Sequence, residues 1–404
     1  YNSGAALTTG SNNVALGYNA MYQGAVTGQY NIAVGSSALR NLTDGPSNVA
    51  IGVNSLEALT TGDRNIAIGM SSSTGYDAEN DNLAIGHSAL AGSVAGGEFN
   101  VAIGNYSLDA LTSADYNVAV GYGSGGAITT GGGNIFMGYD AAASRTEGGD
   151  SVFLGYRAGH GCTTGNDIVF IGKNAGDGHD TEGNNLGIGT NALGGSIAGG
   201  EYNVAVGNNT LDALTSGDYN TAMGYGAGTA VTTGAENVII GASAGLALTE
   251  GSNNVFVGRD SGAANTTAGN NTFIGERAGA ANTTGDESVA IGQFAYAANT
   301  EGADNIAIGR SALTSNTTAN FNIAIGRAAL EANTTGTNNI GIGRLAYDGA
   351  DTEGHNLAIG TGALGGAVAG GEYNIAIGNN SLDALTSADY VTAVGYDAGT
   401  ANTT

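Results

Sequence analysis

Short apolar runs closed by a glycine recur along the whole chain. A typical copy reads Asn48-Val49-Ala50-Ile51-Gly52, and its closing glycine occurs 23 times, at eighteen intervals of 17 residues and four of 18. These glycines are at positions 17, 35, 52, 69, 86, 104, 121, 138, 155, 172, 189, 207, 224, 241, 258, 275, 292, 309, 326, 343, 360, 378 and 395. A fixed period of this size is typical of stacked-repeat proteins.

When the copies are aligned on the closing glycine, the columns of residues before it predict a short strand. The residue directly before it is Val, Ile, Leu or Met in all 23 copies, and the residue three before it is Val, Ile or Leu in 20. The residue between them is Ala in 15 copies and Phe in five. β-Branched residues in so short a run favour a strand over a helix, and the flanking glycines mark its ends.

Each copy therefore predicts one coil of an all-β fold. After the glycine bend comes a second short segment with Ala, Ser or Thr, and a polar turn such as Thr60-Thr61-Gly62 closes the coil. Stacking predicts a parallel β-roll or β-solenoid of about 23 coils with a 17-residue period. Because each coil contacts only its neighbours, we expect one continuous solenoid over residues 1–404. The sequence begins and ends in mid-coil, so we expect a fragment of a longer chain.

Asparagine stands four residues before the closing glycine in 19 of the 23 copies. Its amide is both donor and acceptor, which predicts a ladder of side chains bonded from coil to coil, with turn backbone groups joining in. Asparagine also tolerates the left-handed conformation of a tight corner. The alternative is that it is only a good turn residue. The ladder would include Asn48, Asn65, Asn305, Asn322 and Asn374. It should be interrupted at the four exceptions, Ser151, Ile168, Ser288 and Val391.

The charge balance is strongly acidic. Asp plus Glu number 35 against 10 Lys plus Arg, giving a net charge of −25. The basic footprint of nucleic-acid binding is missing, so no nucleic-acid partner is expected. Carboxylates in the turns are hard oxygen ligands, which makes Ca²⁺ the one cofactor to consider. No run of about 18 apolar residues is present, so we expect no membrane insertion in this segment.

Catalytic groups do not assemble into a recognisable set. The four histidines are scattered, and the only cysteine, Cys162, has just His160 near it in sequence. No second cysteine or ordered histidine pair supports a metal site, and no nucleophile, base and orienting group can be assigned. We therefore expect a protein that is not an enzyme.

Two departures from the monotone repeat are candidate ligand-binding columns, each in three consecutive coils directly after the closing glycine. They are Tyr122, Tyr139 and Tyr156, and Arg310, Arg327 and Arg344. Tyrosines one coil apart predict a flat aromatic strip, which suits an extended glycan better than a small enclosed cofactor. The alternative is that the rings only stack on one another, and that Glu331 and Asp348 balance the arginines.

The unit Asn-Val-Ala-Ile-Gly, with Ala or Ser three residues after the glycine, resembles the head repeat of YadA-like trimeric autotransporter adhesins. Similar repeats occur in phage tail fibres. The resemblance covers the chain from Asn13 to Ala398, although the period here is longer than in the best-known heads. It implies a left-handed parallel β-roll, a trimer of three rolls, and binding to host surfaces such as matrix proteins. The stalk, neck and membrane anchor of that family are not present in this sequence.

A homotrimer is also favoured by the strands themselves. All three strand positions are apolar, and parallel sheets with two apolar faces are normally covered on both. We expect a non-enzymatic extracellular attachment protein at a cell or virion surface, an adhesin head or phage tail fibre. Its rod-like trimer would contact a host-surface glycan or matrix protein. The alternative is a purely structural extracellular filament or surface-layer component.

Overall fold

The computed structural model describes residues 2–93, 96–349, 351–366 and 370–403. Within these residues the regular elements are three-residue strands, and no helix there could cross a membrane. Contacts divide the chain into two compact units, Tyr1–Tyr202 (unit 1) and Asn203–Thr404 (unit 2). A single continuous solenoid over residues 1–404 stays a prediction.

The strands fall at the predicted positions in both units. Unit 1 contains β1 (Val14–Leu16), β2 (Ile32–Val34), β3 (Val49–Ile51), β4 (Ile66–Ile68), β5 (Leu83–Ile85), β6 (Val101–Ile103), β7 (Val118–Val120), β8 (Ile135–Met137), β9 (Val152–Leu154), β10 (Val169–Ile171) and β11 (Leu186–Ile188). Unit 2 contains β12 (Val204–Val206), β13 (Thr221–Met223), β14 (Val238–Ile240), β15 (Val255–Val257), β16 (Thr272–Ile274), β17 (Val289–Ile291), β18 (Ile306–Ile308), β19 (Ile323–Ile325), β20 (Ile340–Ile342), β21 (Leu357–Ile359), β22 (Ile375–Ile377) and β23 (Thr392–Val394).

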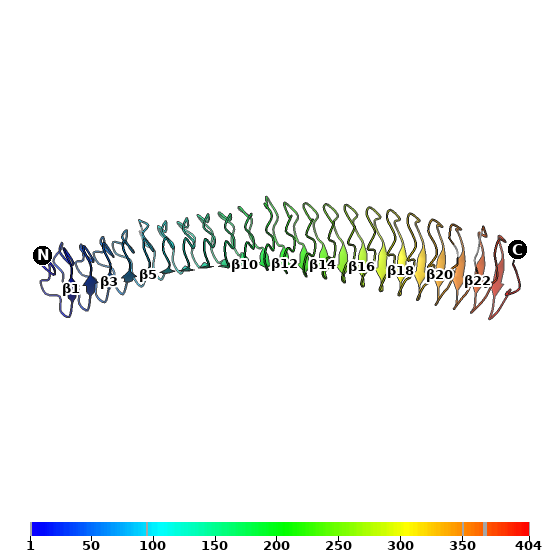
Figure 1. Ribbon diagram of the computed structural model, residues 1–404, viewed down its shortest axis with the longest axis horizontal. Coiled ribbons are helices and arrows are strands. Elements are labelled where there is room, and N and C mark those ends of the chain that lie inside the picture. Colours follow the sequence, from blue (N-terminus) through cyan, green and yellow to red (C-terminus); the bar gives the residue numbers. More distant parts are fainter. Residues whose placement is uncertain (1, 94–95, 350, 367–369, 404) are drawn as a thin grey trace. The chain divides into compact units, whose positions relative to one another are not determined.

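Each strand pairs in parallel with the next strand of its unit, column on column. Val49 of β3 lies opposite Ile66 of β4, and Ile306 of β18 lies opposite Ile323 of β19. Figure 1 shows the repeated coils, each with one strand. Neighbouring coils are thus one strand spacing apart, about 4.8 Å. The predicted all-β parallel solenoid with a 17-residue period is confirmed.

The closing glycines are needed where they stand. Gly52 has a φ of 140°, and a Cβ built on it would lie 2.2 Å from the carbonyl oxygen of Gly69 in the next coil. Only glycine adopts this conformation without strain. The same clash with the next closing glycine recurs along both units, which explains why the column does not vary.

The core is thin and lies inside each coil. The middle strand residue, such as Ala50, points inward and is buried, while Val49 and Ile51 point outward and stay partly exposed. The small residue Ser55 and the following Leu56 close the coil from the other side and are buried. This alternation is the ordinary strand geometry. It leaves an apolar outer face on the sheet.

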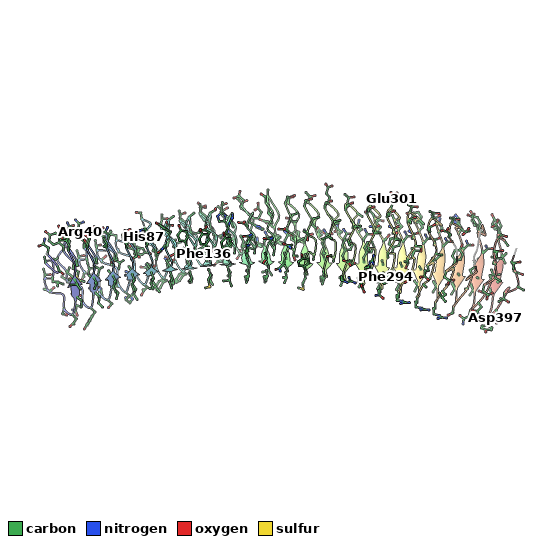
Figure 2. All side chains as sticks on the ribbon, viewed as in Figure 1. Arg40, His87, Phe136, Phe294, Glu301 and Asp397 are labelled. Atoms are coloured by element: carbon green, nitrogen blue, oxygen red, sulfur yellow. The ribbon has the colours of Figure 1, made fainter. Side chains whose placement is uncertain are left out.

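In four of the five coils with phenylalanine in the middle of the strand, the fourth residue after the closing glycine is also glycine. A Cβ on Gly159 would lie 2.2 Å from the ring of Phe153, and one on Gly176 would lie 2.1 Å from Phe170. Nine of the 15 coils with alanine in the strand carry a leucine at the equivalent position, as in Ala50 and Leu56. A large strand residue is thus combined with a small residue elsewhere in the coil, or the reverse, which keeps the thin core close-packed. Figure 2 labels Phe136, another phenylalanine of this strand column.

The asparagines that directly precede the strands, here called the strand asparagines, bond mainly to backbone groups of the next coil. Asn48 Oδ1 accepts the backbone N–H of Asn65 at 2.8 Å, and Asn48 Nδ2 donates to the Gly62 carbonyl at 2.7 Å. Contact between the two amides is longer, at 3.2 Å from Asn65 Nδ2 to Asn48 Oδ1. The left-handed conformation expected at asparagine belongs instead to the residue before it, for example Ser47 with a φ of 62°.

The same bonds occur in unit 2. Asn305 Oδ1 accepts the backbone N–H of Asn322 at 2.9 Å, and Asn374 Oδ1 accepts that of Val391 at 2.8 Å. The expected interruption at serine does not occur, because the Ser288 hydroxyl accepts the Asn305 N–H at 3.2 Å. A hydroxyl on a short side chain reaches the same backbone donor. Valine and isoleucine offer no such acceptor.

Three of the four 18-residue coils follow a coil with a buried glutamate, a feature that sequence reasoning missed. These residues are Glu79, Glu182 and Glu353. Glu353 Oε2 accepts the N–H groups of Asp351 and Thr352 at 3.2 and 3.1 Å, and its Oε1 accepts that of Gly370 in the longer coil at 2.8 Å. Glu79 and Glu182 make equivalent bonds. The carboxylate thus holds the longer loop against the regular coil before it.

Candidate functional site

The three tyrosines after β7, β8 and β9 form a continuous stack, here called the tyrosine ledge. The ring centroids of Tyr122 and Tyr139 are 5.3 Å apart and those of Tyr139 and Tyr156 5.4 Å apart, with interplanar angles of 10° and 11°. Each side chain is about half exposed. In-register strand pairing places the rings directly above one another, as their common column predicts.

The ledge presents ring edges and hydroxyl groups to solvent, because the ring faces are turned toward one another. Tyr106 extends it edge-on at 5.6 Å from Tyr122, and His87 lies edge-on at 5.1 Å from Tyr106. The charge of Asp140 raises the pKa of Tyr139, so its phenol stays a hydrogen-bond donor at neutral pH. The ledge can therefore offer a line of donors and apolar ring edges to an extended molecule.

Arg157 follows Tyr156 beside the ledge, and its guanidinium already has partners. Its Nη2 lies 3.4 Å from Asp177 Oδ1 and 3.4 Å from His160 Nδ1. The His160 ring is also 3.6 Å from the same carboxylate. His160 therefore belongs to a surface cluster, whereas Cys162, its neighbour in sequence, is buried in the core.

The three arginines after β18, β19 and β20 form a second exposed column, here called the arginine strip. It comprises Arg310, Arg327 and Arg344. Within the described residues, no ion pair joins them to a carboxylate. Glu331 and Asp348 do not balance them. Burial raises the pKa of Asp348, and the negative charge of Glu331 raises it further. The charge that acts on Asp348 is thus that of another carboxylate.

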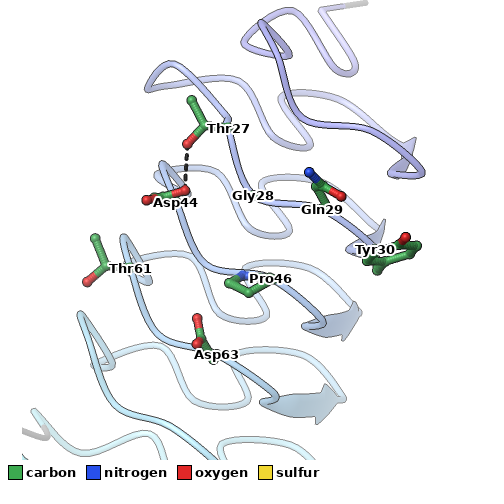
Figure 3. A pocket seen from close by; sticks show the side chains of 8 residues that line it. All are labelled: Thr27, Gly28, Gln29, Tyr30, Asp44, Pro46, Thr61 and Asp63. Carbon is green, nitrogen blue, oxygen red and sulfur yellow. Dashed lines mark hydrogen bonds between the residues drawn. The ribbon is translucent and has the colours of Figure 1, made fainter.

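A shallow cavity of about 550 Å³ lies near the start of unit 1, and nothing in the sequence analysis pointed to it. Figure 3 shows its lining residues, which are Thr27, Gly28, Gln29, Tyr30, Asp44, Pro46, Thr61 and Asp63. Thr27 Oγ1 donates to Asp44 Oδ1 across it at 2.7 Å. It can accept hydrogen bonds from a polar ligand, but it lacks the enclosing apolar walls of a small-molecule site.

Pro46, the only proline, gives a local reason for the cavity. In the neighbouring coils the equivalent residues bond to one another, as when the Asp63 N–H donates to Asn80 Oδ1 at 2.7 Å. Proline has no N–H and no polar side chain, so it can take no part in this turn ladder. The lone proline was the signal that could have located the cavity.

Polar side chains enter the core of unit 1 at the seventh residue after the closing glycine. Arg145, Cys162 and His179 occupy this position in three consecutive coils and are fully buried; we call them the buried polar column. Arg145 donates to Cys162 Sγ at 3.2 Å and to the Gly165 carbonyl at 2.5 Å. Burial raises the pKa of the Cys162 thiol, so it stays protonated.

His179 is the member of this column with the poorest surroundings. Among the described residues neither ring nitrogen makes a hydrogen bond of ordinary geometry, although the backbone of Leu193 makes a polar contact with the ring. The ring packs edge-on against Phe170 at 4.5 Å. Burial lowers the pKa of His179 to about 3, against an opposing pull from the backbone of Leu193. The imidazole is therefore neutral at physiological pH and shielded from substrates.

The same position in unit 2 carries a second ladder, here called the inner asparagine ladder. It consists of Asn282, Asn299, Asn316 and Asn333, all fully buried. Asn299 Nδ2 donates to Asn282 Oδ1 at 2.6 Å, and Asn316 Nδ2 donates to Asn299 Oδ1 at 2.9 Å. Each amide also bonds a turn carbonyl, for example Asn299 to Gly302 at 3.0 Å. The repeated Asn-Thr turns in the sequence were its visible signal.

Metal-binding side chains do not converge in the part of the chain that the structure describes. No group of three or more His, Cys, Asp or Glu residues there is arranged to hold an ion. Uptake of Ca²⁺ by the acidic turns stays a prediction.

Neither a scan of protein-family models nor a search of curated proteins finds a match to this chain. The resemblance to YadA-like heads and phage fibres therefore stays a prediction carried by the repeat alone.

Proposed function

We propose that this chain is a non-enzymatic attachment segment displayed outside a cell or on a virion, as an adhesin head or a phage tail fibre. It works as a homotrimer and contacts a glycan or matrix protein of a host surface. The histidine and cysteine in the core, His179 and Cys162, are shielded from substrates. The described surface offers linear columns of side chains instead.

The tyrosine ledge is the observation that carries this proposal. Three half-exposed rings stand at a regular 5.3 and 5.4 Å, which suits a partner that is itself extended. Tyrosine contributes contact area and a hydrogen bond at low conformational cost, as it does in many binding surfaces. A glycan lying along the ledge would meet ring edges and phenol groups in successive coils.

The apolar outer face of the sheet supports the homotrimer. Ile135, Met137 and Leu154 are each about two-fifths exposed, in two columns that run along the strands. Exposed apolar columns of this kind are normally covered by protein. The resemblance to trimeric heads supplies the number of copies.

The test removes two rings of the ledge. A Tyr139→Ala, Tyr156→Ala variant should lose binding to host cells and to arrayed glycans by about tenfold or more. The matched control is Tyr373→Ala, Tyr390→Ala, since this pair is also exposed and stacked, at 5.1 Å. Light scattering on both variants checks that they keep the oligomeric state of the parent. Undiminished binding by a folded ledge variant would sink the proposal.

A purely structural filament is the second candidate, favoured by a different observation. Hydrogen-bonded columns of asparagine and threonine run through both units, as when Thr283 Oγ1 donates to the Thr300 carbonyl at 2.8 Å. Such columns need no ligand. A parent protein that binds no cell or glycan, yet assembles end to end, would favour this candidate.

A further inference from the structure

The arginine strip differs from the other arginines on the described surface. Arg277 also has no ion pair among the described residues, but its guanidinium lies 5.6 Å from the centre of the Phe294 ring in the next coil. Three other arginines have an acidic partner in the next coil, 17 residues on. The pairs are Arg40 with Glu57, Arg64 with Asp81, and Arg259 with Glu276. In the strip the residue 17 positions after Arg310 is Arg327, and the next is Arg344. Each cation therefore faces another cation.

The same column of unit 2 shows both arrangements within six coils. Arg259 pairs with Glu276, and Glu276 also accepts a hydrogen bond from Gln293 at 2.9 Å. The hydrogen bonds from Gln293 and Arg259 lower the pKa of Glu276. The next three coils carry the three arginines with no acid between them. Like charges in neighbouring coils repel one another. No paired acid from the described part of the chain offsets that repulsion in the strip, as Glu276 does for Arg259.

The surroundings of the strip leave the guanidinium groups accessible from one side. The strip follows Ile308, Ile325 and Ile342 on the strands, and the next residues in two of the coils are the small Ser311 and Ala328. All three arginines are exposed. A partner that extends along the direction in which the coils stack can reach all three charges, because neighbouring coils are about 4.8 Å apart.

We propose that Arg310, Arg327 and Arg344 bind a linear acidic polysaccharide, whose carboxylate or sulfate groups recur along the chain. A guanidinium binds such planar or tetrahedral oxyanions through paired hydrogen bonds. The net charge of −25 disfavours broad anionic partners. A duplex or a lipid surface would meet the acidic turns as well as the strip, whereas a single extended strand meets only the strip. This site is separate from the tyrosine ledge and does not rest on the proposed function.

The experiment compares three polymers of graded charge on the full chain. Dextran sulfate carries sulfate, hyaluronan carries carboxylate, and dextran is neutral. Both charged polymers should bind and dextran should not. Three cation contacts predict a slope of log affinity against log salt of about −2. Each charged polymer should also raise the melting temperature, since a ligand of the folded state stabilises it.

The variant is Arg310→Gln, Arg327→Gln, Arg344→Gln, and its matched control is Arg259→Gln in the same column. The triple variant should lose affinity for both charged polymers by about tenfold or more, and its melting temperature should not fall, because repulsion is relieved. The control should bind like the parent. Binding of sulfate but not carboxylate polymer would restrict the ligand to sulfated glycans and still support the strip.

Three results would overturn the inference. They are equal binding by the triple variant, equal binding of neutral dextran, and tighter binding of a single-stranded oligonucleotide than of either charged polymer. None of them touches the proposed attachment function, which fails only if the ledge variant keeps its cell and glycan binding. The two proposals therefore fail independently.

Discussion

The seventh residue after the closing glycine has opposite character in the two units. In unit 1 the buried polar column brings together three different side chains, of which His179 makes no hydrogen bond of ordinary geometry among the described residues. In unit 2 the inner asparagine ladder places the same side chain in four successive coils, each bonded to the next or to a turn carbonyl. Asn265 is buried at the same position one coil before the ladder, and neither its Oδ1 nor its Nδ2 has a hydrogen-bond partner among the described residues. A buried asparagine in this column is therefore satisfied where it bonds to the asparagine of the adjacent coil, and a mixed set of side chains cannot form such bonds throughout.

Other coils show what the position accepts by default. It holds Leu42, Leu59 and Leu111 in unit 1 and Leu214 and Leu248 in unit 2, all buried. A polar residue there must therefore replace apolar packing with hydrogen bonds. The four asparagines of the inner ladder do so through their donor and acceptor, whereas the side chains of Asn265 and His179 do not.

Replacing one member of each column with leucine should give effects of opposite sign. Asn316→Leu removes three hydrogen bonds, to Asn299, Ala319 and Asn333, and should cost about 3 kcal/mol at about 1 kcal/mol each. His179→Leu removes unpaired polar groups and should leave unit 1 as stable or more stable at pH 7. Amide hydrogen exchange of β18–β20 and of β9–β11 measures the two local stabilities. A loss in both would refute the comparison.

Acid should weaken unit 1 through His179. Its pKa is about 3 in the folded chain and 6.5 ordinarily, so as pH falls below about 6.5 the unfolded chain takes up a proton that the folded chain refuses. Stability present above pH 6.5 is therefore lost progressively down to about pH 3. Between pH 6 and pH 4 the parent should lose about 2.5 kcal/mol relative to His179→Leu. The two proteins, compared at the same pH by hydrogen exchange of β9–β11, should diverge by this amount; parallel curves would mean that the ring is solvated.

The strand asparagines should matter in both units, in contrast to the seventh position. Asn117 and Asn322 each lose a bond to the next coil and one to a turn carbonyl, so either alanine variant should cost about 2 kcal/mol or more. Asn117 also loses longer amide contacts with Asn100 and Asn134, at 3.3 and 3.1 Å, so its variant should be the less stable of the two. Thr318→Ala is the control, since Thr318 is exposed and its change should stay within about 0.5 kcal/mol. Thermal melting of the three variants decides. Equal shifts for asparagine and threonine would remove the strand ladder as a stabilising device.

The strands, the period and the asparagines before the strands could be predicted, because each depends on one position repeated many times. The exchange of Phe153 with Gly159 could not, because glycine is so common here that one more carries no visible signal. The inner ladder was also missed. Its asparagines lie in text that looks like an ordinary Asn-Thr turn, and only the coil geometry turns them inward.

The candidate sites show the same limit. The common column of Tyr122, Tyr139 and Tyr156 predicted their spacing, but the orientation that hides the ring faces depends on rotamers. The lack of carboxylate partners for Arg327 likewise depends on which way Glu331 points. The sequence predicts which residues share a column, whereas the direction of each side chain depends on how it packs against its neighbours.

The buried glutamates bear on how such a chain changes length between generations. Gain or loss of whole coils by unequal recombination leaves every ladder in register, because each new junction presents the same bonds. A gain of one residue does not, unless something binds the extra peptide group. Glu182 follows Glu79 by six coils and Glu353 follows Glu182 by ten. These three long coils are therefore each inherited together with the glutamate that holds the extra residue, and the length of the chain evolves in whole-coil steps.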